Sequence, residues 1–286
     1  MFDEQMQKID VLIRARDPLI YVVSPEEARV TRALAEIAHR EGKRLFTWTE
    51  TMGLQPALSQ IEPDADEATL APLDALEEIR LRKEPAIYLF KDFTPFLENG
   101  YANSTTVVRK LRDLSEYLRT SYATIVLLSP RLFLPIELEK EVCVVDFDLP
   151  GLEELGGLFD GALKALEKQP DIHIKMTPQE RETILKAALG LTLSEAENVF
   201  ARCVVEKQAF SVDDVLAEKK QIIRKSGTLE YYEADDQFKD VGGMELLKSW
   251  LQRRVLAFTE KAKEFGLPAP KGVLLLGVQG CGKSLI

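Results

Sequence analysis

The chain has 286 residues, 45% of them hydrophobic and 29% charged, which is the composition of an ordinary globular protein long enough for two domains. Its net charge of −10 argues against a nucleic-acid backbone or an anionic membrane as the default partner. No apolar run approaches the roughly 18 residues that a membrane span needs, and the acidic, polar start fits neither a signal peptide nor a transit peptide.

Apolar runs of strand length alternate with helical patterns over the first 150 residues. The predicted strands are 19–24, 44–49, 86–90, 124–128 and 142–147. The predicted helices cover 4–16, run from Pro25 to Gly42, cover 72–83, and start again at Asn103. Strands of continuous apolar character indicate a parallel sheet that is covered on both faces. The sequence therefore predicts an α/β domain over residues 1–150.

After Pro150 the pattern changes to helices alone. The predicted helices cover 152–166, 177–189, 194–207 and 211–225. Sequence signatures of N-terminal caps begin at Thr177, Ser194 and Ser211, each with an acidic residue three positions later. We expect a small helical bundle over 151–225, of the kind that forms a lid or subdomain. Residues 226–239 show no clear period and are interpreted as a linker.

A phosphate-binding pattern lies near the end of the sequence. Residues 277–284 read Gly-Val-Gln-Gly-Cys-Gly-Lys-Ser and fit G-x-x-x-x-G-K-[ST], directly after an apolar run at 272–276 that we expect to be a strand. Glycines let backbone N–H groups fold around a phosphate, Lys283 supplies positive charge, and the Ser284 hydroxyl suits Mg²⁺. The candidate nucleotide-binding residues are Gly277, Gln279, Gly280, Cys281, Gly282, Lys283 and Ser284, with Ser284 also the candidate metal ligand. The competing interpretation is a glycine-rich turn that matches by accident.

Two stretches around this loop resemble the entry to an AAA ATPase module. They are 238–243, reading Phe-Lys-Asp-Val-Gly-Gly, and 270–277, which leads into the loop. The resemblance implies that three residues flank the adenine, namely Asp240, Val241 and Gly242. The loop differs from the commonest AAA pattern at Val278, Gln279, Cys281 and Ser284. The whole chain is similar to the AAA proteins of cyanobacteria and plastids named hypothetical chloroplast open reading frame forty-six.

The resemblance also implies a fold and a domain order. It implies a degenerate AAA-like parallel-sheet core of the P-loop class over 1–150, its helical lid over 151–225, the linker 226–239, and the first part of a second AAA module over 240–286. The first module is called degenerate because Ser24-Pro25-Glu26-Glu27 follows its first strand, without glycine or lysine. Two carboxylates there would repel a phosphate. Asp92 stands near the usual metal-holding carboxylate, but Phe93 follows it where a catalytic Glu is usual.

The resemblance implies ATP and Mg²⁺ as cofactors, and ATP hydrolysis coupled to the remodelling of a protein partner by a homo-oligomeric ring of the full-length protein. It also implies a cyanobacterial cytoplasm or a plastid stroma as the location. No Walker B acid, sensor or arginine finger of the second module lies within the sequence, so whether the chain itself is an enzyme stays open, and we expect no catalytic residue in it. The resemblance implies a chain that is truncated at its C-terminus, just after the loop.

Other interpretations remain. The degenerate core and lid could be a non-catalytic interaction or regulatory module whose terminal loop is vestigial. Asp92, Glu26 and Glu27 at strand ends fit a phospho-receiver loosely, although no lysine ends the fifth strand. Cys281 could be a redox switch, or a small residue that simply fits the loop. The other two cysteines and the two histidines have no metal-binding spacing, so we expect a reducing compartment and no histidine-based metal site.

Overall fold

The computed structural model describes residues 2–57, 64–167, 176–207, 210–226 and 243–258, with short stretches at 262, 265–268, 271–272, 274 and 276. The chain divides into two compact units, residues 1–221 and 222–286. The domain boundaries inferred from the sequence remain predictions. Among the described residues, no helix combines the length and apolar character that crossing a membrane requires.

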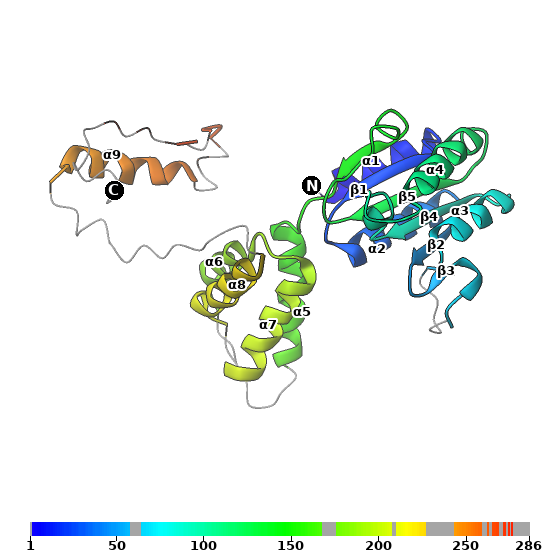
Figure 1. The fold of residues 1–286 in the computed structure, drawn as a ribbon. Coiled ribbons are helices and arrows are strands. Elements are labelled where there is room, and N and C mark those ends of the chain that lie inside the picture. The colour runs from blue at the N-terminus through cyan, green and yellow to red at the C-terminus, as the bar shows by residue number, and fades with distance from the viewer. Residues whose placement is uncertain are drawn as a thin grey trace. The chain divides into compact units, whose positions relative to one another are not determined.

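The first unit is built on a six-stranded sheet in the order β3-β2-β4-β5-β1-β6 (Figure 1). The strands are β1 (Leu19–Val23), β2 (Arg44–Thr49), β3 (Gly53–Pro56), β4 (Ala86–Lys91), β5 (Thr124–Ser129) and β6 (Cys143–Asp146). Every neighbouring pair is parallel except β2 and β3, which are antiparallel. The parallel α/β architecture predicted from continuous apolar runs is confirmed.

Helices cover both faces of this sheet. Two apolar clusters, one on each face, make the core. One cluster contains side chains of α1 (Phe2–Arg14) and α2 (Glu27–Arg40). The other contains side chains of α3 (Pro72–Leu81) and α4 (Ser104–Leu118). The central strands are apolar on both sides because each side faces a helix layer and neither meets water.

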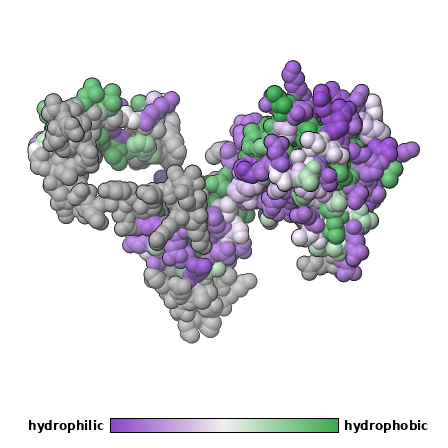
Figure 2. All heavy atoms as spheres, viewed as in Figure 1, coloured by the Kyte–Doolittle hydropathy of each residue, from purple (hydrophilic) through white to green (hydrophobic). Residues whose placement is uncertain are grey.

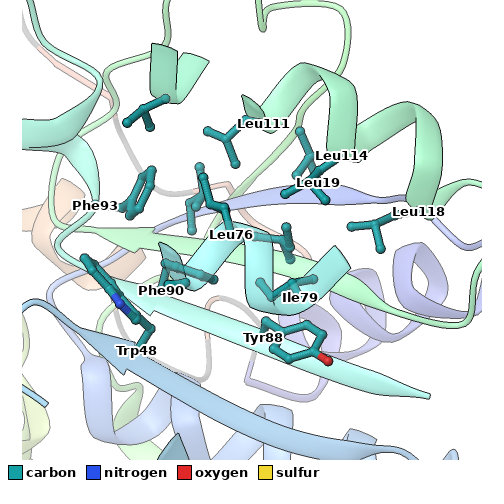
Figure 3. Close-up of a cluster of buried hydrophobic side chains, with 14 of the residues drawn as sticks. Leu19, Trp48, Leu76, Ile79, Tyr88, Phe90, Phe93, Leu111, Leu114 and Leu118 are labelled. Atoms are coloured by element: carbon teal, nitrogen blue, oxygen red, sulfur yellow. The ribbon is translucent and has the colours of Figure 1, made fainter. Parts of the chain in front are cut away.

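Aromatic side chains fill the α3/α4 side of the sheet near the carboxyl ends of β2 and β4 (Figure 3). The ring of Trp48 lies 5.1 Å from that of Phe90 and 5.5 Å from that of Phe93, the second pair edge to face. The indole N–H of Trp48 donates to the carbonyl of Thr69 at 2.7 Å, so the buried polar atom is satisfied. Phe93, which the resemblance places at the position of a catalytic Glu, is therefore a core residue, only 1% exposed.

A four-helix bundle follows the sheet. Its helices are α5 (Leu152–Glu167), α6 (Pro178–Ala188), α7 (Leu193–Lys207) and α8 (Val212–Ser226). The predicted capping box of Thr177 and Glu180 is present. The predicted cap of α7 at Ser194 is wrong, because the helix starts one residue earlier and Thr192 exchanges hydrogen bonds with Glu195. The sequence offers two overlapping signatures there, and the first one is used.

In the second unit the main described element is α9 (Glu245–Val255), followed by a 3₁₀ turn at Leu256–Phe258. No residue of α9 is buried, and hydrophobic residues are visible on the surface of this unit (Figure 2). Gly272, Leu274 and Leu276 are not in a strand, so the strand predicted over 272–276 is not formed at those positions, and its other residues lie outside the described part.

Candidate functional site

The phosphate loop and the predicted adenine-flanking segment lie outside the described residues. This applies to all of 277–286 and to Asp240, Val241 and Gly242. Their roles remain predictions from the sequence. The structure instead describes the equivalent region of the first unit, where the strands of the sheet end.

The topology of the sheet reverses beside β1, which lies between β5 and β6. In open α/β sheets such a reversal marks the place where ligands bind, beyond the carboxyl ends of the strands. Here the backbone N–H of Ser24 donates to the carbonyl of Ser129 at 2.9 Å. The N–H of Asp92 donates to the carbonyl of Leu128, also at 2.9 Å. These bonds hold the ends of β1, β4 and β5 together at the expected ligand position.

The connection from β1 to α2 cannot cradle a phosphate. Only residues 24–26 separate the two elements. Pro25 has no N–H, the N–H of Glu26 donates to the Ser24 hydroxyl at 3.2 Å, and the N–H of Glu27 donates to the Pro25 carbonyl at 3.1 Å. A phosphate loop works by turning several free N–H groups towards the anion. In this connection the N–H groups are used internally or missing.

Glu26 places a carboxylate of its own at this position. Its side chain is only 4% exposed, and Oε1 accepts a hydrogen bond of 2.7 Å from the backbone N–H of Leu193. The Arg29 guanidinium lies 3.7 Å from the same oxygen. Burial raises the pKa of the Glu26 carboxyl, and the Leu193 N–H and Arg29 act against that rise. The side chain therefore takes the position of an anion at the N-terminus of α2.

Arg29 extends this contact to the helical bundle. Its guanidinium binds the Glu154 carboxylate of α5 through two nitrogens, with N···O distances of 2.8 and 3.0 Å. A third nitrogen donates to the Asp148 carbonyl at 2.9 Å, and the guanidinium lies 5.1 Å from the centre of the Phe147 ring. The Arg29 side chain is only 3% exposed. Glu26, Arg29 and Glu154 thus join the sheet domain to α5 and α7, and we call them the core–bundle network.

A solvent-filled cavity of about 700 Å³ also borders the ends of the strands. Glu27, Lys91 and Asp92 line it, and Lys91 pairs with Glu27 at 3.2 Å. Asp92, which the resemblance placed near a metal-holding carboxylate, lines this cavity and has a left-handed backbone, with φ of +52°. Within the described ranges, however, no three His, Cys, Asp or Glu side chains gather in a way that could hold a metal ion.

This arrangement gives no support to the phospho-receiver interpretation. Glu27 is paired with Lys91, and Glu26 is turned towards Arg29 and Leu193. A receiver site needs several carboxylates free to bind Mg²⁺ together. The two glutamates are committed to other partners instead.

The core–bundle network was not predicted from the sequence. The sequence left helix-capping or solvated roles for Glu26 and Glu27, and Glu26 is the N-cap residue of α2 and is buried. One signal was available: Glu26 and Arg29 are spaced i, i+3 at the start of α2, so they lie on one face of the helix. Nothing local indicates that Glu154 and Leu193 complete the set.

Comparisons with known proteins agree with this architecture. The model of the N-terminal domain of SpoVK-like AAA ATPases matches residues 5–147, and the model of their second domain matches 153–226. The chain is 33% identical over 291 aligned positions to an uncharacterized AAA domain-containing protein, ycf46, of Guillardia theta, covering 100% of the chain and 54% of that protein. It is 32% identical to the ycf46 protein of Trieres chinensis, covering 96% of the chain and 54% of that protein. The chain thus spans about half the length of these relatives.

Among solved structures, that of C. elegans PCH-2 matches with a TM-score of 0.50 and 11% identity, covering 78% of this chain and 69% of that one. Similarity at this level of identity shows the fold alone.

Proposed function

This chain belongs to the SpoVK-like AAA ATPase family, and we propose that it binds ATP with Mg²⁺ through residues 277–284. The observation that carries the proposal is the complete match of these residues to the phosphate-loop pattern in a chain of this family. Backbone N–H groups around Gly280 and Gly282 would surround the phosphates, and Lys283 would neutralise them. Ser284 would contribute a hydroxyl to Mg²⁺, and Asp240, Val241 and Gly242 would flank the adenine.

The first unit has a different role in this proposal. The β1–α2 connection offers no free N–H group, and the Glu26 carboxylate is buried where an anion would bind. A polyphosphate entering there would have to displace a carboxylate held by Leu193 and Arg29, and it would meet Glu27 as well. We infer that the first unit binds no nucleotide and provides a fixed surface for regulation or for a partner.

For the full-length protein we propose ATP hydrolysis coupled to remodelling of a protein partner, by a homo-oligomeric ring. This is the activity expected of the family. We assign it to the full-length protein because the relatives are about twice as long as the part of them that matches this chain. The organisms of the relatives support a plastid stroma, or a cyanobacterial cytoplasm, as the place of action.

Equilibrium binding of a fluorescent, non-hydrolysable ATP analogue to the full-length protein tests the nucleotide proposal. We expect saturable binding that requires Mg²⁺ and weakens at least tenfold in Lys283→Ala, since a charged contact to phosphate contributes on the order of 2 kcal/mol. Ser284→Ala should mainly reduce the dependence on Mg²⁺. Equal binding by the wild type and Lys283→Ala would refute the assignment of the loop.

The second candidate is a non-catalytic interaction module, and the closed Glu26 position favours it for residues 1–221. The two candidates differ in what the loop contributes. If the full-length protein binds no ATP analogue but retains its partners in a Lys283→Ala variant, the interaction module describes the whole protein.

A further inference from the structure

A second cavity lies at the N-terminus of α4, and its lining includes Leu97 and Asn99 from the segment that also borders the first cavity. Its volume is about 270 Å³, enough for a small anionic group with part of an organic stem. The lining residues are Leu97, Asn99, Ser104, Thr105, Val108, Arg109, Arg112, Pro135 and Glu137. Figure 1 shows α4 as one of the long helices of the first unit.

The first turn of α4 has unused hydrogen-bond donors. Asn103 precedes the helix, but its side chain makes no capping hydrogen bond, and no acidic residue lies in the first turn. Within the described residues, the backbone N–H groups of Thr105 and Thr106 have no acceptor, whereas that of Val107 donates to the Asn103 carbonyl. Free N–H groups and an uncompensated positive end of a helix attract an anion.

A buried hydroxyl provides an independent observation at the same place. Ser104 is only 6% exposed, and its remaining accessible surface lines the cavity. Its hydroxyl has no hydrogen-bond partner among the residues that the structure describes. The hydroxyl oxygen itself is not sealed from solvent, so a ligand oxygen in the cavity would take the place of water as the acceptor of its hydrogen bond.

Two arginines give the cavity positive charge in an otherwise acidic chain. Arg109 and Arg112 follow Thr105 at i+4 and i+7, so all three lie on one face of α4. Arg109 reaches towards the next turn of the helix, where it meets Asp113, and the Arg112 guanidinium lies close enough to the Glu141 carboxylate to help lower its pKa. Arg109 pairs with Asp113, whereas Arg112 has no ion-pair partner within the described part of the chain. One carboxylate, Glu137, also lines the cavity.

We propose that this cavity binds an oxyanion, a phosphoryl or carboxylate group carried on an apolar stem. The Ser104 hydroxyl and the N–H groups of Thr105 and Thr106 would bind the oxygens, and Arg112 would supply the charge. Leu97, Val108 and Pro135 give the stem an apolar wall. Glu137 disfavours a second negative charge near that wall, so the ligand should carry its charge at one end. This site is separate from residues 277–284.

The test uses three small probes of one shape: phenyl phosphate, benzoate and neutral benzamide. Each is titrated into the ¹⁵N-labelled chain carrying Lys283→Ala, so that the terminal loop does not compete, while the amide signals of Thr105 and Thr106 are followed. We expect saturable shifts with at least one of the two anions and none with benzamide. The anion that binds more tightly, phenyl phosphate or benzoate, shows whether the site prefers a phosphoryl or a carboxylate group.

Two variants decide whether the binding is specific. Arg112→Gln should weaken the binding at least tenfold, and Ser104→Ala should weaken it several-fold. Arg119→Gln is the charge control, because it removes the same charge from the C-cap residue of α4, where Arg119 pairs with Glu141 outside the lining of this cavity. Equal weakening by Arg112→Gln and Arg119→Gln, or an absence of saturable shifts at Thr105 and Thr106, would overturn the proposal.

Discussion

The Glu26 carboxylate and the Leu193 backbone N–H lie 2.7 Å apart, although 167 positions separate them in the sequence. Glu26 is the N-cap residue of α2, and Leu193 is the first residue of α7. One buried carboxylate therefore lies at the N-termini of two helices, and both helix dipoles favour a negative charge there. A helix N-terminus at the end of β1 is where this class of fold places a phosphate, and here a side chain takes that position.

Replacing Glu26 should affect stability in a way that depends on the acceptor oxygen. Glu26→Ala leaves the Leu193 N–H buried without an acceptor, which costs about 1–3 kcal/mol of the free energy of unfolding. Glu26→Gln keeps an oxygen that can accept the bond and should cost clearly less. Urea unfolding of both variants, with hydrogen exchange at the Leu193 amide, measures the difference. If the two substitutions lower the free energy of unfolding equally, the hydrogen bond between Glu26 and the Leu193 N–H does not contribute to stability.

The stability contributed by Glu26 should also depend on pH. Burial raises its pKa above the ordinary 4.5 in the folded state, and the carboxylates of Glu154 and Glu195 add to the rise, while the Leu193 N–H and Arg29 oppose it. The folded protein then binds the proton more tightly than the unfolded chain does. Stability from this group must therefore increase as pH falls from neutral through the folded pKa, and level off below about 4.5.

Glu26→Gln isolates this effect because it has no proton to exchange. The free energy of unfolding of the wild type, minus that of Glu26→Gln, should grow on acidification over that pH range. A difference that falls on acidification would mean that Glu26 has a lowered pKa and is stabilised chiefly by Arg29.

The ion pair of Arg29 and Glu154 should couple more strongly than an exposed pair of the same length. Arg29–Glu154 and Arg202–Glu218 both have N···O distances of 2.8 Å, and both glutamates are 26% exposed. The arginines differ, because Arg29 is 3% exposed and Arg202 is 58% exposed. Double-mutant cycles to alanine should give a coupling of about 1–3 kcal/mol for the first pair and below about 1 kcal/mol for the second. Similar couplings would show that the burial of Arg29 contributes nothing.

Two buried tyrosines should respond in opposite ways to loss of the hydroxyl. The Tyr88 hydroxyl is buried without a partner among the described residues, and burial raises its pKa to about 12. The Tyr21 hydroxyl lies 2.8 Å from both the Thr94 hydroxyl and the Arg131 carbonyl. Tyr88→Phe should therefore leave the free energy of unfolding unchanged or raise it by up to about 1 kcal/mol, whereas Tyr21→Phe should lower it by about 1–2 kcal/mol. Destabilisation by Tyr88→Phe would reveal a partner for that hydroxyl.

Local patterns in the sequence predicted most of the first unit. β1, β4 and β5 are continuous apolar runs, and such runs have few alternatives to a buried parallel strand. β3 was not predicted, because its four residues, Gly53–Pro56, carry no periodic pattern. It depends on Gly53, which has φ of +69°, and a Cβ there would lie 2.5 Å from the Asp66 carbonyl oxygen. Contacts between distant segments decide that strand.

The candidate site also has one part that the sequence predicted and one part that it did not. The phosphate loop is recognisable because its chemistry requires fixed residue types at fixed spacing within a short segment. The sequence also indicated that Ser24–Glu27 cannot bind phosphate. It gave no sign that Glu26 is buried, because its partners Leu193 and Arg29 come from two different helices. Whether a carboxylate is solvated or replaces a ligand is decided by tertiary structure.

The central claim is that the Glu26 carboxylate closes the first unit to nucleotide and that residues 277–284 bind the nucleotide. The number of nucleotides bound per chain tests this claim most directly. Equilibrium dialysis of the full-length protein with a non-hydrolysable ATP analogue and Mg²⁺ measures it, alongside Lys283→Ala. We predict one analogue per chain for the wild type and clearly less than one for Lys283→Ala, at a concentration that just saturates the wild type. Two analogues per wild-type chain, or a full equivalent on Lys283→Ala at that concentration, would indicate a site in the first unit and contradict this prediction.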